Sequence, residues 1–160
     1  MIKFDELREL RPVVQYKNGA EITLETVQNA IVDCAQSMGL PVAFYADQVK
    51  SGSVFNKTVE DCIVLYHPEH RNDYFKICIR VSRQGSYAFV SAMDFGTSKQ
   101  MKKAGQAEAY RESRKGQSMS FKIGSLIGQG ITSIGRSKSK LEEEQNYYAC
   151  IIDIFDEIVS

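Results

Sequence analysis

The two histidines of the chain lie close together in the segment 66–73, which reads Tyr-His-Pro-Glu-His-Arg-Asn-Asp. Imidazole is a common zinc ligand and a general base near neutral pH, so His67 and His70 suit a metal-dependent enzyme if a nearby carboxylate supplies a third ligand. The same segment, with its proline, asparagine and charges, is also typical of a solvated turn between two strands. We favour the turn and keep the metal-dependent enzyme as a third hypothesis.

A basic stretch in the second half of the chain is a candidate site for an anionic ligand. Residues 99–140 hold ten Lys and Arg against two acidic residues, whereas residues 141–160 hold six acidic residues and no basic one. Well-placed cations and an aromatic ring are enough to contact a nucleic acid or another polyanion. A solvated helix, partly neutralised by the acidic C-terminal helix, is the plainer alternative. The candidate contacts are Lys99, Lys102, Lys103, Tyr110, Arg111, Arg114, Lys115 and Lys122.

The cysteines and the glycine-rich segment favour packing over catalysis. The four cysteines lie in apolar segments without a Cys-x-x-Cys pair, as expected of free structural thiols in a reducing compartment. The glycine-rich segment lacks the Lys and Ser/Thr of a phosphate-binding loop. Gly124 and Gly128, four residues apart, would instead let another backbone approach a helix closely. Cations beside the apolar stripe there also allow binding at a membrane surface, which we do not favour because core packing needs the same stripe.

Helical periodicity predicts two long elements. Apolar residues recur at the spacing of one helix face over 24–38, and Thr23 can cap the start. The same spacing predicts a C-terminal helix over 140–159, where Ser139 and Glu142 match a capping box. Weaker patterns predict further helices from Phe4 to Leu10, over 97–116 and over 121–134.

Extended segments fill the region between these helices. Alternating apolar residues predict strands over 42–47, 59–67, 74–83 and 86–95, with a less certain extended piece at Val54-Phe55. A further short extended piece is expected over 13–16, before the turn signal Asn18-Gly19. The glycine at position 85 predicts a tight antiparallel hairpin between the last two strands. We expect one side of this hairpin to present small apolar residues where a solvated face would be polar, so a later helix or a second copy should cover it. The residues on this side are Cys78, Ala88, Val90 and Ala92.

These patterns together predict a single α+β domain over residues 1–160. We expect an antiparallel sheet of four to five strands with an N-terminal and a C-terminal helix packed on it, and the basic and glycine-rich helical segments inserted before the last helix. With no secretion signal and no apolar run of about 18 residues, we expect a cytoplasmic protein, and we expect no bound cofactor.

The function we favour from the sequence is a non-catalytic binding or assembly module. We expect it to associate with itself, in the simplest case as a homodimer, and we keep polyanion binding through 99–122 as the alternative. The residues expected in self-association are Cys78, Ala88, Val90, Ala92, Gly124 and Gly128.

Overall fold

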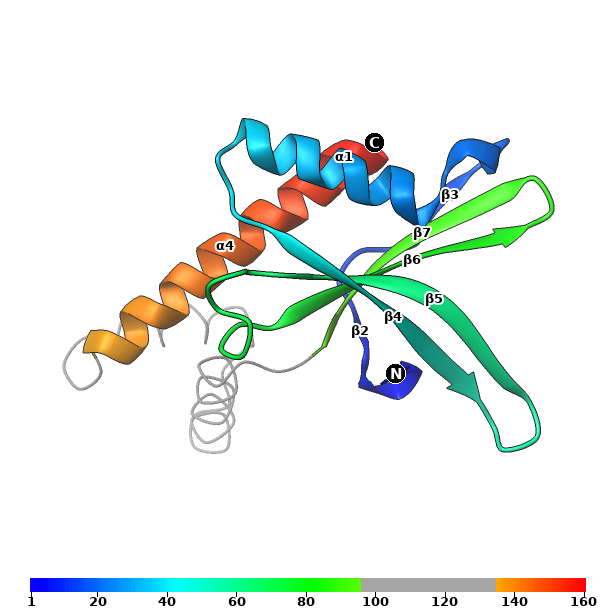
Figure 1. Ribbon diagram of the computed structural model, residues 1–160, viewed down its shortest axis with the longest axis horizontal. Helices are drawn as coiled ribbons and strands as arrows, with labels where there is room; N and C mark the ends of the chain where they lie inside the picture. The colour runs from blue at the N-terminus through cyan, green and yellow to red at the C-terminus, as the bar shows by residue number, and fades with distance from the viewer. Residues whose placement is uncertain (96–134) are drawn as a thin grey trace, which may run out of the picture. The chain divides into compact units, whose positions relative to one another are not determined.

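The computed structural model describes residues 1–95 and 135–160, with side chains in the last helix from Lys140 onward. The predicted helices over 97–116 and 121–134 lie outside these residues. The elements, coloured along the chain in Figure 1, are β1 (Ile2–Lys3), η1 (Phe4–Glu6), β2 (Arg8–Glu9), β3 (Val14–Tyr16), η2 (Gly19–Glu21), α1 (Leu24–Ser37), β4 (Ala43–Gly52), β5 (Lys57–Tyr66), β6 (Lys76–Gln84), β7 (Tyr87–Phe95) and α4 (Gly135–Val159).

The strands form one mixed, seven-stranded sheet, so the expected antiparallel sheet of four to five strands is correct only for its long strands. The order is β1-β4-β5-β6-β7-β2, and β3 also pairs with β7. The four long strands pair antiparallel, whereas β1 runs parallel to the end of β4, with Ile2 beside Val49. The strands β1 and β2, of two residues each, are too short to show alternation in a sequence, whereas β3 lies in the extended piece predicted over 13–16.

The N-terminal segment is not the predicted helix from Phe4 to Leu10. Only η1 is helical, as a single 3-10 turn, and strands flank it on both sides. The segment joins the two edges of the sheet, since β1 pairs with β4 and β2 pairs with β7. Five residue steps separate Lys3 from Arg8, and extended chain spans at most about 18 Å over that length. The sheet must therefore curl until its two edges approach each other.

The helix predicted over 24–38 is confirmed as α1. Thr23 caps it, because its hydroxyl accepts from the Thr26 amide while the Thr26 hydroxyl accepts from the Thr23 amide. The predicted stripe is the buried one, with Val27, Ile31 and Ala35 on the inner side. The C-terminal helix is also present, although it begins at Gly135, earlier than predicted.

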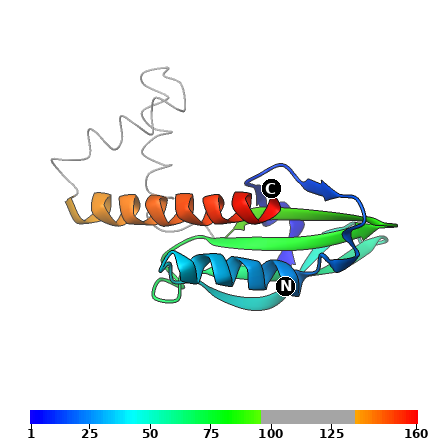
Figure 2. The same cartoon turned by 90° about the horizontal axis from the view of Figure 1, so that it is seen from above.

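The helix α1 and the C-terminal end of α4 lie on the same face of the sheet (Figure 1 and, from above, Figure 2). Arg11 holds that end of α4 through an ion pair of 2.9 Å with Asp156. The cavity left between the helices and the strands, next to Leu65 and Phe155, is only about 10 Å³. This is room for no more than one water molecule, so side chains fill the helix-covered face.

The register of the β6–β7 hairpin corrects the prediction of which β6 and β7 residues share a face of the sheet. A two-residue turn at Gly85-Ser86 pairs Gln84 with Tyr87, Cys78 with Met93 and Ile79 with Ala92. Each even-numbered residue of β6 therefore lies opposite an odd-numbered residue of β7. Ala92 shares the helix-covered face with Ile79, whereas Cys78 is on the other face, so the grouping of Cys78 with Ala88, Val90 and Ala92 is wrong.

The second face of the sheet has an apolar cluster of its own. Beneath the N-terminal segment, β4, β5 and β6 contribute buried residues to it, and Leu7, Tyr45 and Phe95 pack around them. The buried members are Ile2, Val49, Cys62, Val64 and Cys78. Both faces of the sheet are thus covered, as expected, and the cover comes from the same chain.

Residue contacts divide the chain into two units, Met1–Gly96 with Ile151–Ser160, and Thr97–Cys150. The first unit contains the whole sheet and α1. The expectation of a single domain stays a prediction. Neither described helix is long and apolar enough to cross a lipid bilayer.

Candidate basic–aromatic site

The segment between β5 and β6 is a turn, and hydrogen bonds fix its backbone. The amide of His70 donates to the His67 carbonyl at 3.1 Å, and the amide of Tyr74 donates to the His70 carbonyl at 3.0 Å. The His70 ring stacks on the Tyr74 ring with centroids 4.3 Å apart. His67 is buried beneath them, at 9% exposure. Backbone hydrogen bonds and contacts between the rings therefore both hold the turn in one conformation.

His67 supports this turn in its neutral form. Its Nδ1 atom accepts a hydrogen bond of 3.1 Å from the Glu69 amide, so the proton of the neutral ring belongs on Nε2. Burial lowers the pKa of His67, and the neighbouring His70 lowers it further. No group of three His, Cys, Asp or Glu among the described residues is arranged to hold a metal ion. The histidines therefore lie together, 4.7 Å between ring centroids, without a third ligand in that part of the chain.

Two tyrosines and two cations meet beside this turn. The Arg71 guanidinium carbon lies 5.7 Å from the centre of the Tyr45 ring and 5.3 Å from that of Tyr66. The Lys76 ammonium lies 5.7 Å from the centre of the Tyr45 ring. The two rings are tilted, with centroids 5.7 Å apart. We call Tyr45, Tyr66, Arg71 and Lys76 the basic–aromatic patch.

Strand pairing explains how residues so far apart in sequence come together. Tyr45 lies opposite Val64 of β5, and Tyr66 is two residues further along that strand, on the same face. Lys76 begins β6, and Arg71 comes from the turn between them. Both tyrosines and the lysine are half-buried, whereas Arg71 is exposed. The patch thus combines a rigid base on three elements with an accessible guanidinium.

The charges of the patch are not balanced locally. Neither Arg71 nor Lys76 has a carboxylate within salt-bridge distance in the described part of the chain. The pKa of Tyr45 is raised by burial and then by Asp47, while Arg71 acts in the opposite direction. Asp47 itself lies 3.3 Å from the N-terminal ammonium group. The patch therefore presents two cations against aromatic rings, and neither forms an ion pair with a described residue.

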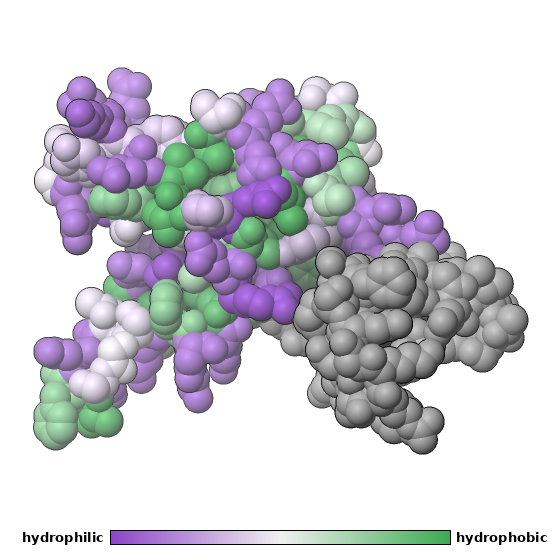
Figure 3. All heavy atoms as spheres, turned by 180° about the vertical axis from the view of Figure 1, so that it is seen from behind, coloured by the Kyte–Doolittle hydropathy of each residue, from purple (hydrophilic) through white to green (hydrophobic). Residues whose placement is uncertain are grey.

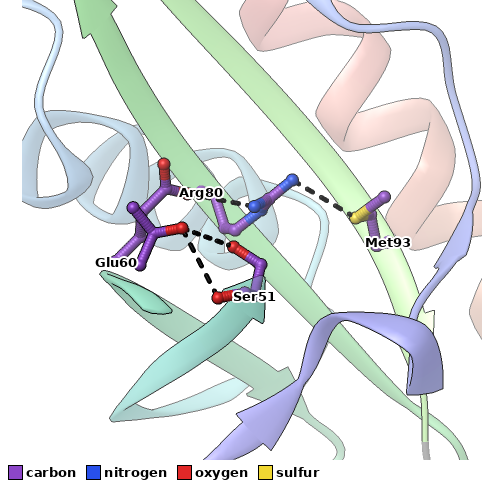
Figure 4. A network of polar contacts seen from close by, with 5 residues as sticks. Ser51, Glu60, Arg80 and Met93 are labelled. Atoms are coloured by element: carbon purple, nitrogen blue, oxygen red, sulfur yellow. Dashed lines mark hydrogen bonds and ion pairs between the residues drawn. The ribbon is translucent and has the colours of Figure 1, made fainter. Parts of the chain in front are cut away.

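Arg80, on the same face of β6, shows the contrasting arrangement (Figure 4). Its guanidinium donates to the Glu60 carboxylate at 3.0 Å and lies 3.7 Å from the sulfur of Met93. The Phe4 ring of the N-terminal segment covers it, with the guanidinium carbon 5.1 Å from the ring centre. Arg80 is thus neutralised and enclosed by its own chain, and we assign it a structural role.

The cysteine thiols offer no accessible nucleophile on this face. Cys62 and Cys78 are 1% and 0% exposed, and their side chains are hydrogen-bonded to each other. That hydrogen bond and burial raise the pKa of Cys78 far above the ordinary thiol value, although Arg80 acts to lower it. The protonated thiol is a poor nucleophile, so Cys78 packs rather than reacts.

The site residues predicted from the sequence fall into three groups in the structure. His67 and His70 come together in the turn. The residues proposed for self-association on the sheet, Cys78, Ala88, Val90 and Ala92, are all buried within one chain, at 3% exposure or less. The polyanion candidates from Lys99 to Lys122, and the glycines Gly124 and Gly128, lie outside the described residues and stay predictions.

The basic–aromatic patch was not found from the sequence. Tyr66 and Arg71 lie in the histidine segment itself, beside His67 and His70, and an aromatic and a cationic residue so close together could have indicated the patch. Tyr45 joins the patch only because of the register between β4 and β5. The sequence shows no clear turn between these strands, so it does not predict their register.

Comparison with known proteins gave no match: no protein-family model, curated protein or solved structure is significantly similar to this chain.

Proposed function

We propose that this protein is a non-catalytic binding module that recognises a polyanion through the basic–aromatic patch. One observation carries the proposal: Arg71 and Lys76 both lie against the Tyr45 ring, and neither has an acidic partner among the described residues. An anion beside these cations supplies the opposite charge that the described residues do not.

The tyrosines prepare Arg71 for such a ligand. Each cation–π contact at an exposed site contributes about 0.5–1 kcal/mol, which restricts the long side chain before any ligand arrives. The guanidinium keeps its planar set of N–H donors, which match the oxygens of a phosphate or carboxylate. Cations beside aromatic faces are also a common arrangement in proteins that bind single-stranded nucleic acid. A phosphate-rich chain is therefore the polyanion we favour.

The two groups with catalytic chemistry in this region, His67 and Cys78, are engaged in the fold. His67 uses Nδ1 to hold the turn, and Cys78 is buried in its protonated form. These observations support a binding module over an enzyme.

Fluorescence anisotropy with a labelled single-stranded oligonucleotide tests the proposal. Affinity should fall between about 50 and 200 mM salt, because binding to phosphates releases counterions. Replacing both cations (Arg71→Gln with Lys76→Gln) should make the slope of log K against log salt less steep by about 1.4, as expected for two lost contacts with a single strand. The matched control is Lys17→Gln, which removes an exposed lysine elsewhere. An unchanged slope in the double variant contradicts the proposal.

The basic stretch 99–122 remains a separate proposal for the same class of ligand, supported by its charge alone. Charge reversal at Lys102 and Arg114 (Lys102→Glu with Arg114→Glu) tests it. If that variant loses binding while the patch variant keeps it, the stretch is the binding site and the patch is not.

Self-association is a second candidate function, and the open edge of β4 supports it. From Ala43 to Gln48, β4 pairs with β5 on one side and with no strand on the other among the described residues, because β1 covers only Val49 and Lys50. An edge strand with free N–H and C=O groups can pair with its counterpart in a second copy. This edge takes the place of the buried surface that the sequence suggested for a homodimer.

A proline on this edge tests the homodimer. The Gln48 amide donates to the side chain of its neighbour Asp47 at 2.8 Å, so we expect this amide and that of Ala46, two residues earlier, to face away from β5. Ala46→Pro removes that outward donor, and proline is tolerated on an edge strand at such a position. Light scattering should give the dimer mass for wild type and for the control Ala46→Thr, and the monomer mass for Ala46→Pro. A monomeric wild type overturns this candidate.

A further inference from the structure

The hairpin between β4 and β5 projects beyond the sheet that supports it. The strands β4 and β5 pair over ten positions, from Ala43–Tyr66 to Gly52–Lys57, whereas β5 and β6 pair over only three, from Ile63 to Leu65. Beyond Lys50, where the pairing of β1 with β4 ends, the hairpin continues as a two-stranded ribbon, visible at the lower right of Figure 1. A ribbon without a third strand has nothing against which to bury a side chain.

Two large apolar residues lie at the end of this ribbon. Val54 is 80% exposed and Phe55 is 96% exposed, and we call this pair the apolar tip. In Figure 3, seen from behind, hydrophobic side chains mark the end of the projection at the lower left. The turn that presents them is well formed, since the Asn56 amide donates to the Ser53 carbonyl at 3.2 Å. Gly52 has φ of 97° there, and a Cβ atom on it would collide with the Asn56 carbonyl.

The charged residues nearest the apolar tip are lysines, and the first acidic residues on the hairpin, Glu60 and Asp61, lie further from it. Residues 50–59 contain two lysines, Lys50 and Lys57, and no acidic residue. Lys3 of β1 lies beside Lys50 and adds a third cation. Val59, opposite Lys50 on the ribbon, is 49% exposed and extends the apolar surface. The ribbon therefore combines protruding hydrocarbon at its end with cations behind it.

We propose that the apolar tip inserts into the surface of an anionic lipid bilayer. A single protruding pair of side chains fits a medium that closes around it, whereas a protein partner would need a matching hollow. Apolar side chains enter the boundary between headgroups and acyl chains, and lysines behind them attract the anionic headgroups. The lysines next to the tip favour an anionic surface over a neutral one, since the Glu60 carboxylate is already paired with Arg80. Binding through so small a tip is reversible and depends strongly on lipid charge and on salt.

This contact is separate from the polyanion site. Tyr45 and Gly52 are seven residues apart in one strand, which corresponds to about 23 Å. The tip can therefore enter a lipid surface without the basic–aromatic patch, and neither proposal rests on the other.

The absence of tryptophan from the chain allows a direct test. Phe55→Trp places a single fluorophore on the apolar tip, and Tyr87→Trp places one at the base of the β6–β7 turn as the matched control. With phosphatidylserine-containing vesicles, the emission of Phe55→Trp should shift to shorter wavelength, and brominated lipid should quench it. Neither effect should occur with Tyr87→Trp. No shift at position 55, or an equal shift at position 87, overturns the proposal.

Vesicle co-sedimentation of the full chain provides the second readout. The double variant Val54→Ser with Phe55→Ser should bind at least tenfold more weakly, and Lys50→Gln with Lys57→Gln several-fold more weakly in low salt. Equal binding to pure phosphatidylcholine vesicles overturns the role of charge. A blue shift of Phe55→Trp that grows with protein concentration in the absence of lipid identifies a second copy as the occupant instead, and also overturns the proposal.

Discussion

The β4–β5 hairpin carries aromatic and cationic side chains at one end and exposed apolar side chains at the other. At the patch end, Tyr45, Tyr66 and Arg71 contact one another, and buried His67 fixes the turn beside them. At the tip end, Val54 and Phe55 are almost fully exposed, although the turn that carries them is just as well defined.

The cause of the difference is the number of strands at each end. Around Leu65 the hairpin has β6 beside it and cover on both faces, whereas around Phe55 it is a bare ribbon. Large side chains at the patch end are therefore positioned by neighbours, and those at the tip end are positioned by the backbone alone. Exposure of a polar cluster is ordinary in a surface site, but exposure of an ordered apolar pair points to a contact outside the chain.

The largest expected effect contrasts packing at the two ends. Leu65 is 2% exposed and lines the small cavity beneath the helices. Leu65→Ala should lower the free energy of unfolding by about 2–5 kcal/mol, because it removes buried methyl groups and leaves a void. Phe55→Ala should change it by no more than about 0.5 kcal/mol, as for a surface residue. Urea titration measures both, and similar losses would show that the tip is packed.

A glycine substitution should show that the backbone sets the tip. Gly52→Ala meets both an unfavourable φ and a collision with Asn56, so we expect a loss of about 1–3 kcal/mol. Gly39→Ala is the matched control, since Gly39 also has positive φ, 66°, but no atom lies within 4 Å of its added Cβ. The control should lose less stability and keep full vesicle binding. Equal losses would remove the argument that the turn at the tip is sterically specified.

The sequence predicted those parts of the fold in which one element carries its own signal. Thr23 and the stripe of Val27, Ile31 and Ala35 defined α1 almost to the residue, because capping and periodicity are local. The β6–β7 hairpin was equally predictable from the turn at Gly85, although the β6 and β7 residues that share a face were not matched correctly. The extended piece predicted over 13–16 is β3, whereas β1 and β2 were missed because their stability comes from pairing with β4 and β7, not from their own residues.

The two candidate sites depended on information that a sequence pattern does not contain. Val54-Phe55 suggested an extended segment, since apolar residues are typical of strands, and only the pairing of Gly52 with Lys57 places them in a turn. The sequence showed the histidines of the patch region but not Tyr45, which strand register brings to Arg71. Local patterns identify elements, and register decides which side chains meet.

Two single variants, one at each end of the hairpin and each measured with both ligands, test whether the two ends bind independently. Phe55→Ser should weaken vesicle binding about tenfold, equivalent to about 1.4 kcal/mol, because most of one aromatic burial is lost. It should leave oligonucleotide affinity unchanged. Arg71→Gln should do the reverse, with a several-fold loss for the oligonucleotide and none for vesicles. If either variant weakens both ligands equally, the two ends form one binding surface and the comparison fails.

The smallest expected effect is a pH dependence at the patch end. Burial and His70 lower the pKa of His67, so below the ordinary histidine value of about 6.5 the unfolded chain binds a proton more readily than the folded one. By linkage, this contribution to stability is complete above that pH and is lost as the pH falls towards the lower folded value. His67→Asn keeps an acceptor for the Glu69 amide but does not titrate. Urea titrations at several pH values should show a shallower acid decline for this variant than for wild type, whereas vesicle binding by the tip should be the same for both proteins at each pH. Parallel stability curves would mean that His67 is not held neutral by the turn, and the rigid support inferred for Arg71 would lose its basis.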